Sequence, residues 1–278
     1  MTYKKSDSKS IQEKEQLAEF DRLVASGVGK KKACELIGVS KGTPYNLRKR
    51  LGVVAVVRNI LVIGDLHEPF CLDGYLEFCK QQYKKYKCNK VVLIGDLIDN
   101  HFSSYHDTDP DGMGGGYELD LAIKRLKPWY KAFPIADVCI GNHDKLPRRK
   151  AFSGGVPKAW MKEYKDVLGV PKWTFKTEFI YDNVVYTHGT NKARAKAKND
   201  LTSVVQGHLH SDFYIDYFVG RNYAIFAMQV GCGVDREAYA LAYAKNFPKQ
   251  AIGCWVVLDN GTRPILCLAK LFNNKIIV

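Results

Sequence analysis

The sequence predicts an α/β domain that is preceded by a small all-helical segment. Three short apolar runs, rich in β-branched residues, alternate with amphipathic stretches between residues 59 and 140. A strand–helix–strand alternation of this kind forms right-handed βαβ units and a largely parallel sheet. Residues 1–58 differ, because their apolar positions recur at helical spacing. We therefore expect a helical segment at residues 1–55 and a larger domain at residues 56–278.

The amino-acid composition is typical of a globular protein and not of a membrane or secreted one. The 278 residues are 46% hydrophobic and 26% charged, as in globular proteins. No apolar run reaches the ~18 residues of a membrane span, and the first residues lead into charged positions instead of an apolar signal segment. We therefore expect a cytoplasmic protein without a membrane partner. The eight cysteines include no Cys-x-x-Cys pair, which predicts buried, reduced thiols.

The basic excess is concentrated at the front of the chain. The formal net charge is +13, and residues 1–58 hold thirteen Lys and Arg against six Asp and Glu, which gives +7 on this segment. Such an asymmetry predicts an anionic partner, and nucleic acid, in particular DNA, is the leading candidate. A solvated basic face is the alternative.

The helical segment has the outline of a helix-turn-helix. We expect polar, disordered residues at 1–10 and helices at 11–25, 30–37 and 41–51. Gly38 ends the second helix and allows the tight turn, and Ser40 is the N-cap of the third helix. That helix carries side chains suited to phosphates and base edges: Lys41, Asn46 and Arg48. A helical pair that docks on the larger domain or mediates assembly is the alternative.

The larger domain begins with three predicted strands, at residues 59–63, 91–94 and 135–140. Helices are expected at 73–86 and 117–130, and residues 101–116 form a polar, glycine-rich loop. Further strands are expected at residues 174–180, 183–187, 202–206, 212–218, 223–229 and 253–259. The carboxyl ends of parallel strands meet at one edge of a sheet, which is where such sheets place their ligands.

Polar side chains gather at these strand ends. Residues with carboxylate, amide or imidazole groups follow five glycine-containing strand ends: Asp65, His67, Asp96, Asp99, Asn142, His143, His188, His208 and His210. One histidine in such a place is ordinarily structural. Five strand-end histidines interleaved with carboxylates instead predict two divalent cations with mixed nitrogen and oxygen ligands.

These motifs resemble those of the calcineurin-like metallophosphoesterase superfamily over residues 59–259. The motifs stand in the family's order: Asp65-x-His67, Gly95-Asp96-x-x-Asp99, Gly141-Asn142-His143-Asp144, His188 and Gly207-His208-x-His210. The resemblance implies a two-sheet sandwich flanked by helices (α/β/β/α). It also implies a metal-dependent hydrolase that acts on phosphate esters.

The resemblance further implies a role for each residue. One ion would be held by Asp65, His67, Asp96 and His210, and the other by Asp96, Asn142, His188 and His208. Asp96 would then bridge two ions that activate a water for attack on phosphorus. His143 would be the general acid, Asp99 would orient it, and Asp144 would be structural. We expect manganese, with iron or zinc as alternatives.

At two positions the sequence departs from the protein Ser/Thr phosphatase branch of the superfamily. Asn100 and Asp144 stand where protein Ser/Thr phosphatases have Arg and Glu, which argues against a protein phosphatase. Residues 100–112 resemble the corresponding stretch of metallophosphatases encoded by bacteriophages and prophages, which implies the bacterial cytosol. His101 and His106 in that loop either contact substrate or satisfy polar groups of the loop.

Two basic clusters bear on the substrate. Residues 145–150, with Arg148 and Arg149, follow His143, and residues 192–198 follow His188. A polyanion lying across the centre would explain both clusters, and a solvated face is the alternative. The leading hypothesis is a nuclease-like or DNA-repair-like phosphodiesterase. The alternatives are a phosphomonoesterase or small-substrate phosphodiesterase with a docking segment, and a DNA-binding regulator with a vestigial metal site.

Overall fold

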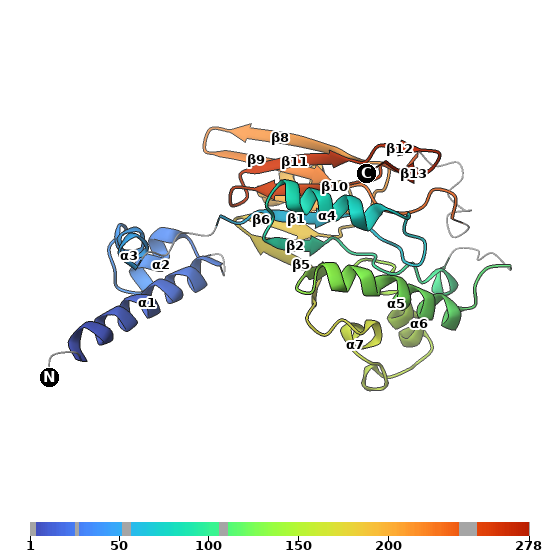
Figure 1. The fold of residues 1–278 in the computed structure, drawn as a ribbon, viewed down its shortest axis with the longest axis horizontal. Helices are drawn as coiled ribbons and strands as arrows, with labels where there is room; N and C mark the ends of the chain where they lie inside the picture. Colours follow the sequence, from blue (N-terminus) through green and yellow to red (C-terminus); the bar gives the residue numbers. More distant parts are fainter. Residues whose placement is uncertain (1–3, 26–27, 52–56, 106–110, 239–248, 278) are drawn as a thin grey trace. The chain divides into compact units, whose positions relative to one another are not determined.

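The chain forms two compact units that divide between Val57 and Arg58, except that residues 180–183 group with the first unit. The computed structural model describes residues 4–25, 28–51, 57–105, 111–238 and 249–277 (Figure 1). Within these ranges, every helix is too short or too polar to cross a membrane.

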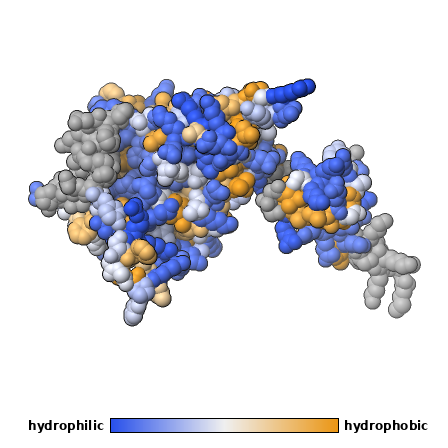
Figure 2. All heavy atoms as spheres, turned by 180° about the vertical axis from the view of Figure 1, so that it is seen from behind, coloured by the Kyte–Doolittle hydropathy of each residue, from blue (hydrophilic) through white to orange (hydrophobic). Residues whose placement is uncertain are grey.

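The first unit contains three helices: α1 (Lys4–Ala25), α2 (Lys30–Leu36) and α3 (Thr43–Leu51). Its small core is formed by Phe20, Ala33 and Cys34, and Figure 2 shows apolar residues gathered on one face of the unit. The sequence predicted three helices but expected residues 1–10 to be disordered. Helix α1 instead begins at Lys4, since no glycine or proline interrupts residues 4–10.

The turn between α2 and α3 depends on Gly38, whose φ of +68° lies in the left-handed region that favours glycine. After it, the Val39 amide donates to the Cys34 carbonyl at 2.9 Å. Ser40, the expected N-cap, lies before the helix start, and its hydroxyl lies 2.8 Å from that of Thr43. Helix α3 begins at Thr43, which places Pro44 in the first turn, where its missing N–H costs little.

The second unit contains two main sheets. The first has the order β11-β10-β1-β2-β3-β4. Strands β1 to β4 run parallel, as predicted, whereas β10 pairs antiparallel with β1 and β11 antiparallel with β10. Their bounds are β1 (Ile60–Ile63), β2 (Lys90–Leu93), β3 (Asp137–Cys139), β4 (Thr174–Lys176), β10 (Gly253–Leu258) and β11 (Arg263–Leu268). Pro264 is tolerated in β11 because this strand lies at the sheet edge.

The second sheet has the order β5-β6-β7-β9-β8. Strands β6, β7 and β9 run parallel, and β8 pairs antiparallel with β9. The bounds are β5 (Glu178–Tyr181), β6 (Val184–Thr187), β7 (Ser203–Gln206), β8 (Tyr214–Gly220) and β9 (Tyr223–Gln229). A short hairpin near the C-terminus pairs β12 (Leu271–Phe272) with β13 (Lys275–Ile276).

The single strand predicted at residues 174–180 is in fact two strands, β4 and β5, in different sheets. Pairing with the first sheet ends where the Ile140 amide donates to the Lys176 carbonyl at 2.8 Å. The next carbonyl, that of Thr177, accepts from the hydroxyl of Thr187 at the end of β6 (3.3 Å). The chain therefore passes from one sheet to the other at Thr177.

Helices α4 and α5 cover the first sheet (Figure 1), and α8 packs on the second, which confirms the predicted α/β/β/α class. Side chains of α4 and α5, such as Tyr75 and Leu126, belong to the core of the first sheet, and Ala193 and Ala197 of α8 pack on the second. Central strands β1, β6, β7 and β10 are buried along their whole length, because both of their faces are covered. The helices are α4 (Tyr75–Lys85), α5 (Gly115–Ala132), α6 (Leu146–Ser153), α7 (Tyr164–Leu168), α8 (Ala193–Asp200) and the 3₁₀ turns η1 (His101–Ser103) and η2 (Lys158–Trp160).

All eight cysteines are buried and none is in a disulfide, as their spacing predicted. Several elements were not predicted: β11, α6, α7, α8, the 3₁₀ turns η1 and η2, and the short hairpin. The basic stretches after His143 and His188 lie on α6 and α8, so each is part of a helix and not of a loop.

Candidate metal centre

The loops that follow β1, β2, β3, β6 and β7 bring the predicted polar residues together. Their acidic and imidazole side chains form three groups whose ligand atoms lie within 4.8 Å of one another: Asp65, His67 and His210; His67, Asp96 and His143; and Asp96, His188 and His208. Asn142 joins the third group, since its Oδ1 lies 2.9 Å from Nε2 of His188. Strands of both sheets therefore deliver one continuous cluster.

Asp96 lies between the histidines of two groups. Its Oδ2 is 3.2 Å from Nε2 of His188 and 3.6 Å from Nε2 of His67. Its Oδ1 accepts a hydrogen bond from the main-chain amide of His143 at 2.9 Å. The residue is 1% exposed, so no solvent competes for these oxygens.

Asp65 holds the other end of the cluster. Its Oδ2 accepts a hydrogen bond from the His208 amide at 2.9 Å and lies 3.1 Å from Nε2 of His210. Its Oδ1 faces Nδ1 of His188 at 3.8 Å. Asp65 is fully buried and therefore ties the loops after β1 and β7 to each other.

Three observations test whether these residues fit divalent cations. Oδ1 of Asp65 and Nε2 of His67 are buried and have no hydrogen-bond partner among the described residues. An unpartnered buried polar atom costs about 1–3 kcal/mol, and a cation would satisfy both atoms. A Cβ at position 141 would lie 2.0 Å from Oδ1 of Asp96. Glycine is therefore required at this position, because any side chain would occupy the space of the carboxylate. Imidazole, carboxylate and amide oxygen together suit Mn, Fe and Zn, and the residues therefore fit a metal pair.

The backbone at the centre is strained. His67, Asp96 and His208 have φ values of 48°, 47° and 72°, which side chains with a Cβ rarely adopt. Non-glycine residues persist in this region only when their surroundings enforce it, and such residues concentrate at functional sites.

The buried acids and imidazoles shift each other's pKa values. Burial opposes ionisation of Asp96, but His188 outweighs it and lowers the pKa of Asp96 far below its usual range. Burial also opposes ionisation of Asp65, whose pKa His188 and His210 lower. Against the effect of burial, Asp96 and Asp65 raise the pKa of His188 to about 9. Both carboxylates are thus ionised and available to a cation.

Asp99 contacts two histidines in different ways. Its carboxylate Oδ1 lies 2.5 Å from Nδ1 of His67 and 3.4 Å from Nδ1 of His143. The group that bonds Nδ1 of His143 is the main-chain carbonyl of Asp99, at 2.6 Å. The sequence assigned this carboxylate to His143, whereas its nearest partner in the structure is His67.

Asp144 fixes the loops that present the ligands. Its carboxylate accepts hydrogen bonds from the amides of Asp96 (2.9 Å), Leu97 (3.0 Å) and Gly141 (2.8 Å) and from the hydroxyl of Tyr164 (2.7 Å). This is the structural role that the sequence predicted for Asp144. Burial and the neighbouring Asp96 raise the pKa of this carboxyl.

Two residues beside the centre were not foreseen in these roles. Asn100 donates from Nδ2 to the His143 carbonyl at 3.0 Å, so the residue that replaces the phosphatase Arg positions the loop of His143. Buried Glu118 of α5 accepts from the amides of His101 (2.7 Å) and Phe102 (3.2 Å) and so holds η1. No motif marks Glu118, because its partners are main-chain amides. His101 is buried beside Asp99, and His106 lies outside the described residues.

The two basic stretches of the second unit differ in their partners. In the stretch of residues 192–198, Lys192 and Lys196 pair with Asp212 (3.4 Å) and Asp200 (2.9 Å), and Arg194 pairs with Asp216. On α6, Arg148 contacts the Lys162 carbonyl (3.2 Å) and Glu163 (3.4 Å), whereas Arg149 lies over the ring of Tyr105. The α8 stretch is thus largely neutralised.

The predicted nucleic-acid residues of the first unit also differ from one another. Lys41 and Asn46 are exposed. Arg48 forms an ion pair with Asp21 and lies 5.6 Å over the ring of Phe20, so it holds α3 against α1. Lys41 and Asn46 are therefore the two whose side chains are exposed to a partner.

Several solved structures are similar to this chain at low sequence identity. Vacuolar Protein Sorting 29 from Cryptosporidium parvum is 12% identical to this chain, and the likeness covers 80% of this chain and 95% of that one with a TM-score of 0.44. The phosphoesterase Yfce from E. coli is 15% identical, and the likeness covers 79% of this chain and 97% of that one with a TM-score of 0.37. The Pseudomonas putida nuclease MPE is 10% identical, and the likeness covers 74% of this chain and 85% of that one with a TM-score of 0.32. These likenesses are too distant to carry an argument about substrate. A search of curated proteins found no match.

The decisive comparison is with a family model. The model of the calcineurin-like phosphoesterase family matches residues 58–231, which is more than half of the chain. The match includes every strand-end residue described above, from Asp65 to His210. The chain therefore belongs to the calcineurin-like phosphoesterase family and is a hydrolase that acts on ester bonds.

Proposed function

We propose that this chain is a dinuclear-metal phosphodiesterase that cleaves nucleic acid, with DNA as the leading substrate and manganese as the leading metal. The position of Asp96 carries the proposal, because its Oδ2 lies within 3.6 Å of histidines from both ligand groups. A carboxylate in that place can serve two cations at once. The proposed setting is the cytosol of a bacterium, with a bacteriophage or prophage origin.

Asp65, His67, Asp96 and His210 would hold one divalent cation, and Asp96, Asn142, His188 and His208 the other. When bound, such a pair polarises a phosphate and lowers the pKa of water. Asp99 keeps His67 oriented through the 2.5 Å contact with its Nδ1, so that Nε2 points to Asp96. Asp144 holds the Asp96 and Gly141 amides in place, which keeps the ligands from the two loops in register.

His143 would give the leaving oxygen its proton. A carbonyl oxygen can only accept, so Nδ1 of His143 must donate to the carbonyl of Asp99 at 2.6 Å. This bond fixes the ring, and in the imidazolium form Nε2 carries the second proton, which would pass to the leaving oxygen. The His143 side chain is 17% exposed, against 3% for His67 and 2% for Asp96, which supports an approach of the substrate from its side.

A nucleic acid substrate is supported by charge. The chain has a net charge of +13, and the basic stretch of residues 145–150 begins two residues after His143. The exposed Lys41 and Asn46 of the helical unit are proposed to hold DNA in helix-turn-helix fashion. The N-terminal unit would then add affinity, while the metal centre performs the chemistry.

One observation favours a second candidate. Because three of the four cations in residues 192–198 are paired with acids, the stretch of residues 145–150 is the more available of the two to a polyanion. A phosphomonoesterase or a phosphodiesterase for small substrates, with the helical unit as a docking element, would need no second basic stretch. An intact set of ligands argues against the third reading, a DNA-binding regulator with a vestigial centre.

A substrate panel tests the proposal. Purified full-length protein would be assayed with and without Mn²⁺ on single- and double-stranded DNA, RNA, cyclic nucleotides, bis(p-nitrophenyl) phosphate and p-nitrophenyl phosphate. We expect metal-dependent cleavage of nucleic acid that weakens steeply with salt. Turnover of the monoester alone, with DNA and RNA intact, would contradict the proposal and support the second candidate.

A further inference from the structure

We propose that an open cavity on α6 binds one unpaired nucleotide of the substrate strand, so that the enzyme acts on single-stranded nucleic acid or on unpaired ends. This inference rests on the proposed function. The cavity has a volume of about 310 Å³, within the range of small-molecule sites. It is lined by Tyr105, Lys145, Arg148, Arg149, Phe152 and Ser153.

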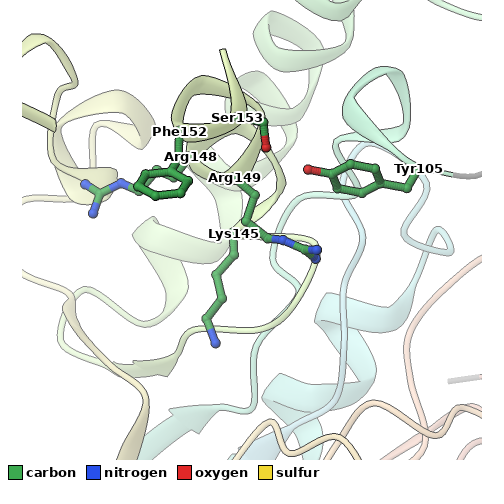
Figure 3. Close-up of a pocket in the computed structure, with 6 residues that line it drawn as sticks. All are labelled: Tyr105, Lys145, Arg148, Arg149, Phe152 and Ser153. Atoms are coloured by element: carbon green, nitrogen blue, oxygen red, sulfur yellow. The ribbon is translucent and has the colours of Figure 1, made fainter. Parts of the chain in front are cut away.

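The cavity combines aromatic rings with cations. Figure 3 shows the ring of Tyr105 on one side and that of Phe152 on the other, with the guanidinium of Arg149 between them. The Arg149 guanidinium carbon lies 4.9 Å and the Lys150 ammonium 4.5 Å from the centre of the Tyr105 ring. Tyr105 is 55% exposed and Phe152 84% exposed, so both rings are open to a ligand.

Most cations around this cavity have no acidic partner among the described residues. Among the described residues, no carboxylate lies within ion-pair distance of Lys145, Arg149 or Lys150, whereas Arg148 has Glu163. Three positive charges therefore lie beside two exposed rings. Proteins that bind single strands pair a cationic track for the backbone with aromatic platforms on which bases stack.

Both walls of the cavity continue the loops of the metal centre. One wall starts at Lys145, two residues after His143, and its amide donates to the Asn142 carbonyl at 3.2 Å. Two residues of chain span at most about 7 Å, so this wall begins next to the general acid. The other wall, Tyr105, follows η1, which Glu118 fixes directly after Asp99 and Asn100. A strand whose phosphate lies at the centre would place the adjoining nucleotide in the cavity.

The rings make the cavity selective for unpaired bases. A base can stack on Tyr105 or Phe152 only if that face is not covered by a neighbouring base, as it is inside a duplex. Cations alone would bind single and double strands alike. The geometry therefore assigns phosphate binding to Lys145 and Arg149, and strand selection to Tyr105 and Phe152.

The test compares two substrates on the same variants. With Mn²⁺ present, kcat/KM would be measured for a single-stranded dodecathymidylate and for bis(p-nitrophenyl) phosphate, which has no adjoining nucleotide. We expect Tyr105→Ala, Phe152→Ala and Arg149→Ala each to lower kcat/KM for the oligonucleotide by about tenfold, with less than a twofold change for the aryl diester. Tyr105→Phe and Arg149→Lys should retain most of the activity.

Matched controls are Tyr217→Ala, which removes a ring that is 60% exposed on β8, and Arg221→Ala, which removes an exposed cation. Neither should change kcat/KM for either substrate. As a second readout, dodecathymidylate should inhibit hydrolysis of the aryl diester, with an inhibition constant that rises about tenfold in Tyr105→Ala.

The outcomes separate this inference from the proposed function. If the wild-type protein hydrolyses the aryl diester but cleaves no nucleic acid, the proposed substrate is wrong and the inference falls with it. If the wild type cleaves the oligonucleotide and Tyr105→Ala and Arg149→Ala cleave it equally well, the inference alone is wrong. An equal loss on both substrates would also overturn it, because it would show a structural role.

Discussion

The carboxylate of Asp99 lies 2.5 Å from Nδ1 of His67. This contact holds one ring nitrogen of His67 and leaves Nε2, which is buried without a hydrogen-bond partner among the described residues, facing Asp96. Histidine ligands of metals ordinarily donate a hydrogen bond from their second ring N–H to a carboxylate, a carbonyl or water, which fixes the tautomer and the ring orientation. Asp99 is therefore a positioning residue for a proposed ligand, in addition to its carbonyl contact with His143.

Replacing Asp99 by Asn should weaken metal binding. Because the charge that orients His67 is lost, we expect the affinity for Mn²⁺ to fall about 10- to 100-fold. Titration of Mn²⁺ into metal-free protein, followed by calorimetry, would measure it. Asp120→Asn, which alters an exposed carboxylate of α5, is the control and should bind Mn²⁺ like the wild type. Unchanged affinity in Asp99→Asn, with a shift in the pH–rate profile alone, would instead assign the carboxylate to His143.

Tyr164→Phe should destabilise the larger unit without removing a ligand. The hydroxyl of Tyr164 donates to the buried Asp144 carboxylate at 2.7 Å. Loss of a hydrogen bond to a charged group should lower the free energy of unfolding by about 2 kcal/mol. Urea denaturation of the metal-free protein would measure the change.

Tyr130→Phe is the matched control, since no hydrogen bond of the Tyr130 hydroxyl is found among the described residues. Equal stability of the two variants would mean that the bond to Asp144 contributes nothing.

Metal affinity should fall as the pH is lowered. Against the effect of burial, Asp96 and Asp65 raise the pKa of His188 to about 9 in the metal-free protein, so His188 carries a proton at neutral pH. That proton stabilises the metal-free fold fully below the ordinary pKa of about 6.5, and the stabilisation is lost as the pH rises through about 9. A cation must displace the proton, so the apparent affinity should rise about tenfold per pH unit between pH 7 and pH 8. An affinity for Mn²⁺ that is constant over this range would contradict the proposed role of His188.

Lys41 and Asn46 should contribute to DNA binding and not to chemistry. The double variant Lys41→Ala/Asn46→Ala should bind duplex DNA more weakly, and the slope of log affinity against log salt should decrease by about one because one phosphate contact is lost. Hydrolysis of bis(p-nitrophenyl) phosphate should be unchanged. Fluorescence anisotropy at several salt concentrations would measure the binding.

Lys32→Ala, an exposed residue of α2, is the control for a general loss of charge. If the control and the double variant lose equal affinity, α3 has no special role in binding DNA, and the docking interpretation of the helical unit is favoured.

The ligand cluster was predictable because it depends on strand ends. Asp65, Asp96 and Asn142 each follow a β-strand and a glycine-containing turn, and parallel strands bring such ends to one edge. The contact of Asp99 with His67 was not predictable. It depends on the left-handed backbone of His67 and Asn100, with φ of 48° and 52°, and no local residue pattern specifies that conformation.

Some of the unpredicted elements carry a signal in the sequence. The alanine and lysine content of α8 favours a helix, and Pro147 lies at the start of α6, where proline is common. Glu118 and Tyr164 carry no such signal, because their partners are reached only through the tertiary fold.

The number of metal ions bound by Asp96→Asn tests the central claim most directly. If Asp96 belongs to both ligand groups, wild-type protein should bind two Mn²⁺ per chain, and Asp96→Asn should lose tight binding of both. The variant His210→Ala should weaken binding of the ion held by Asp65 and His67 more than binding of the other ion. The variant His208→Ala should do the reverse. Elemental analysis after equilibrium dialysis would count the ions. Retention of one tightly bound ion by Asp96→Asn, at wild-type affinity, would contradict the bridging role of Asp96.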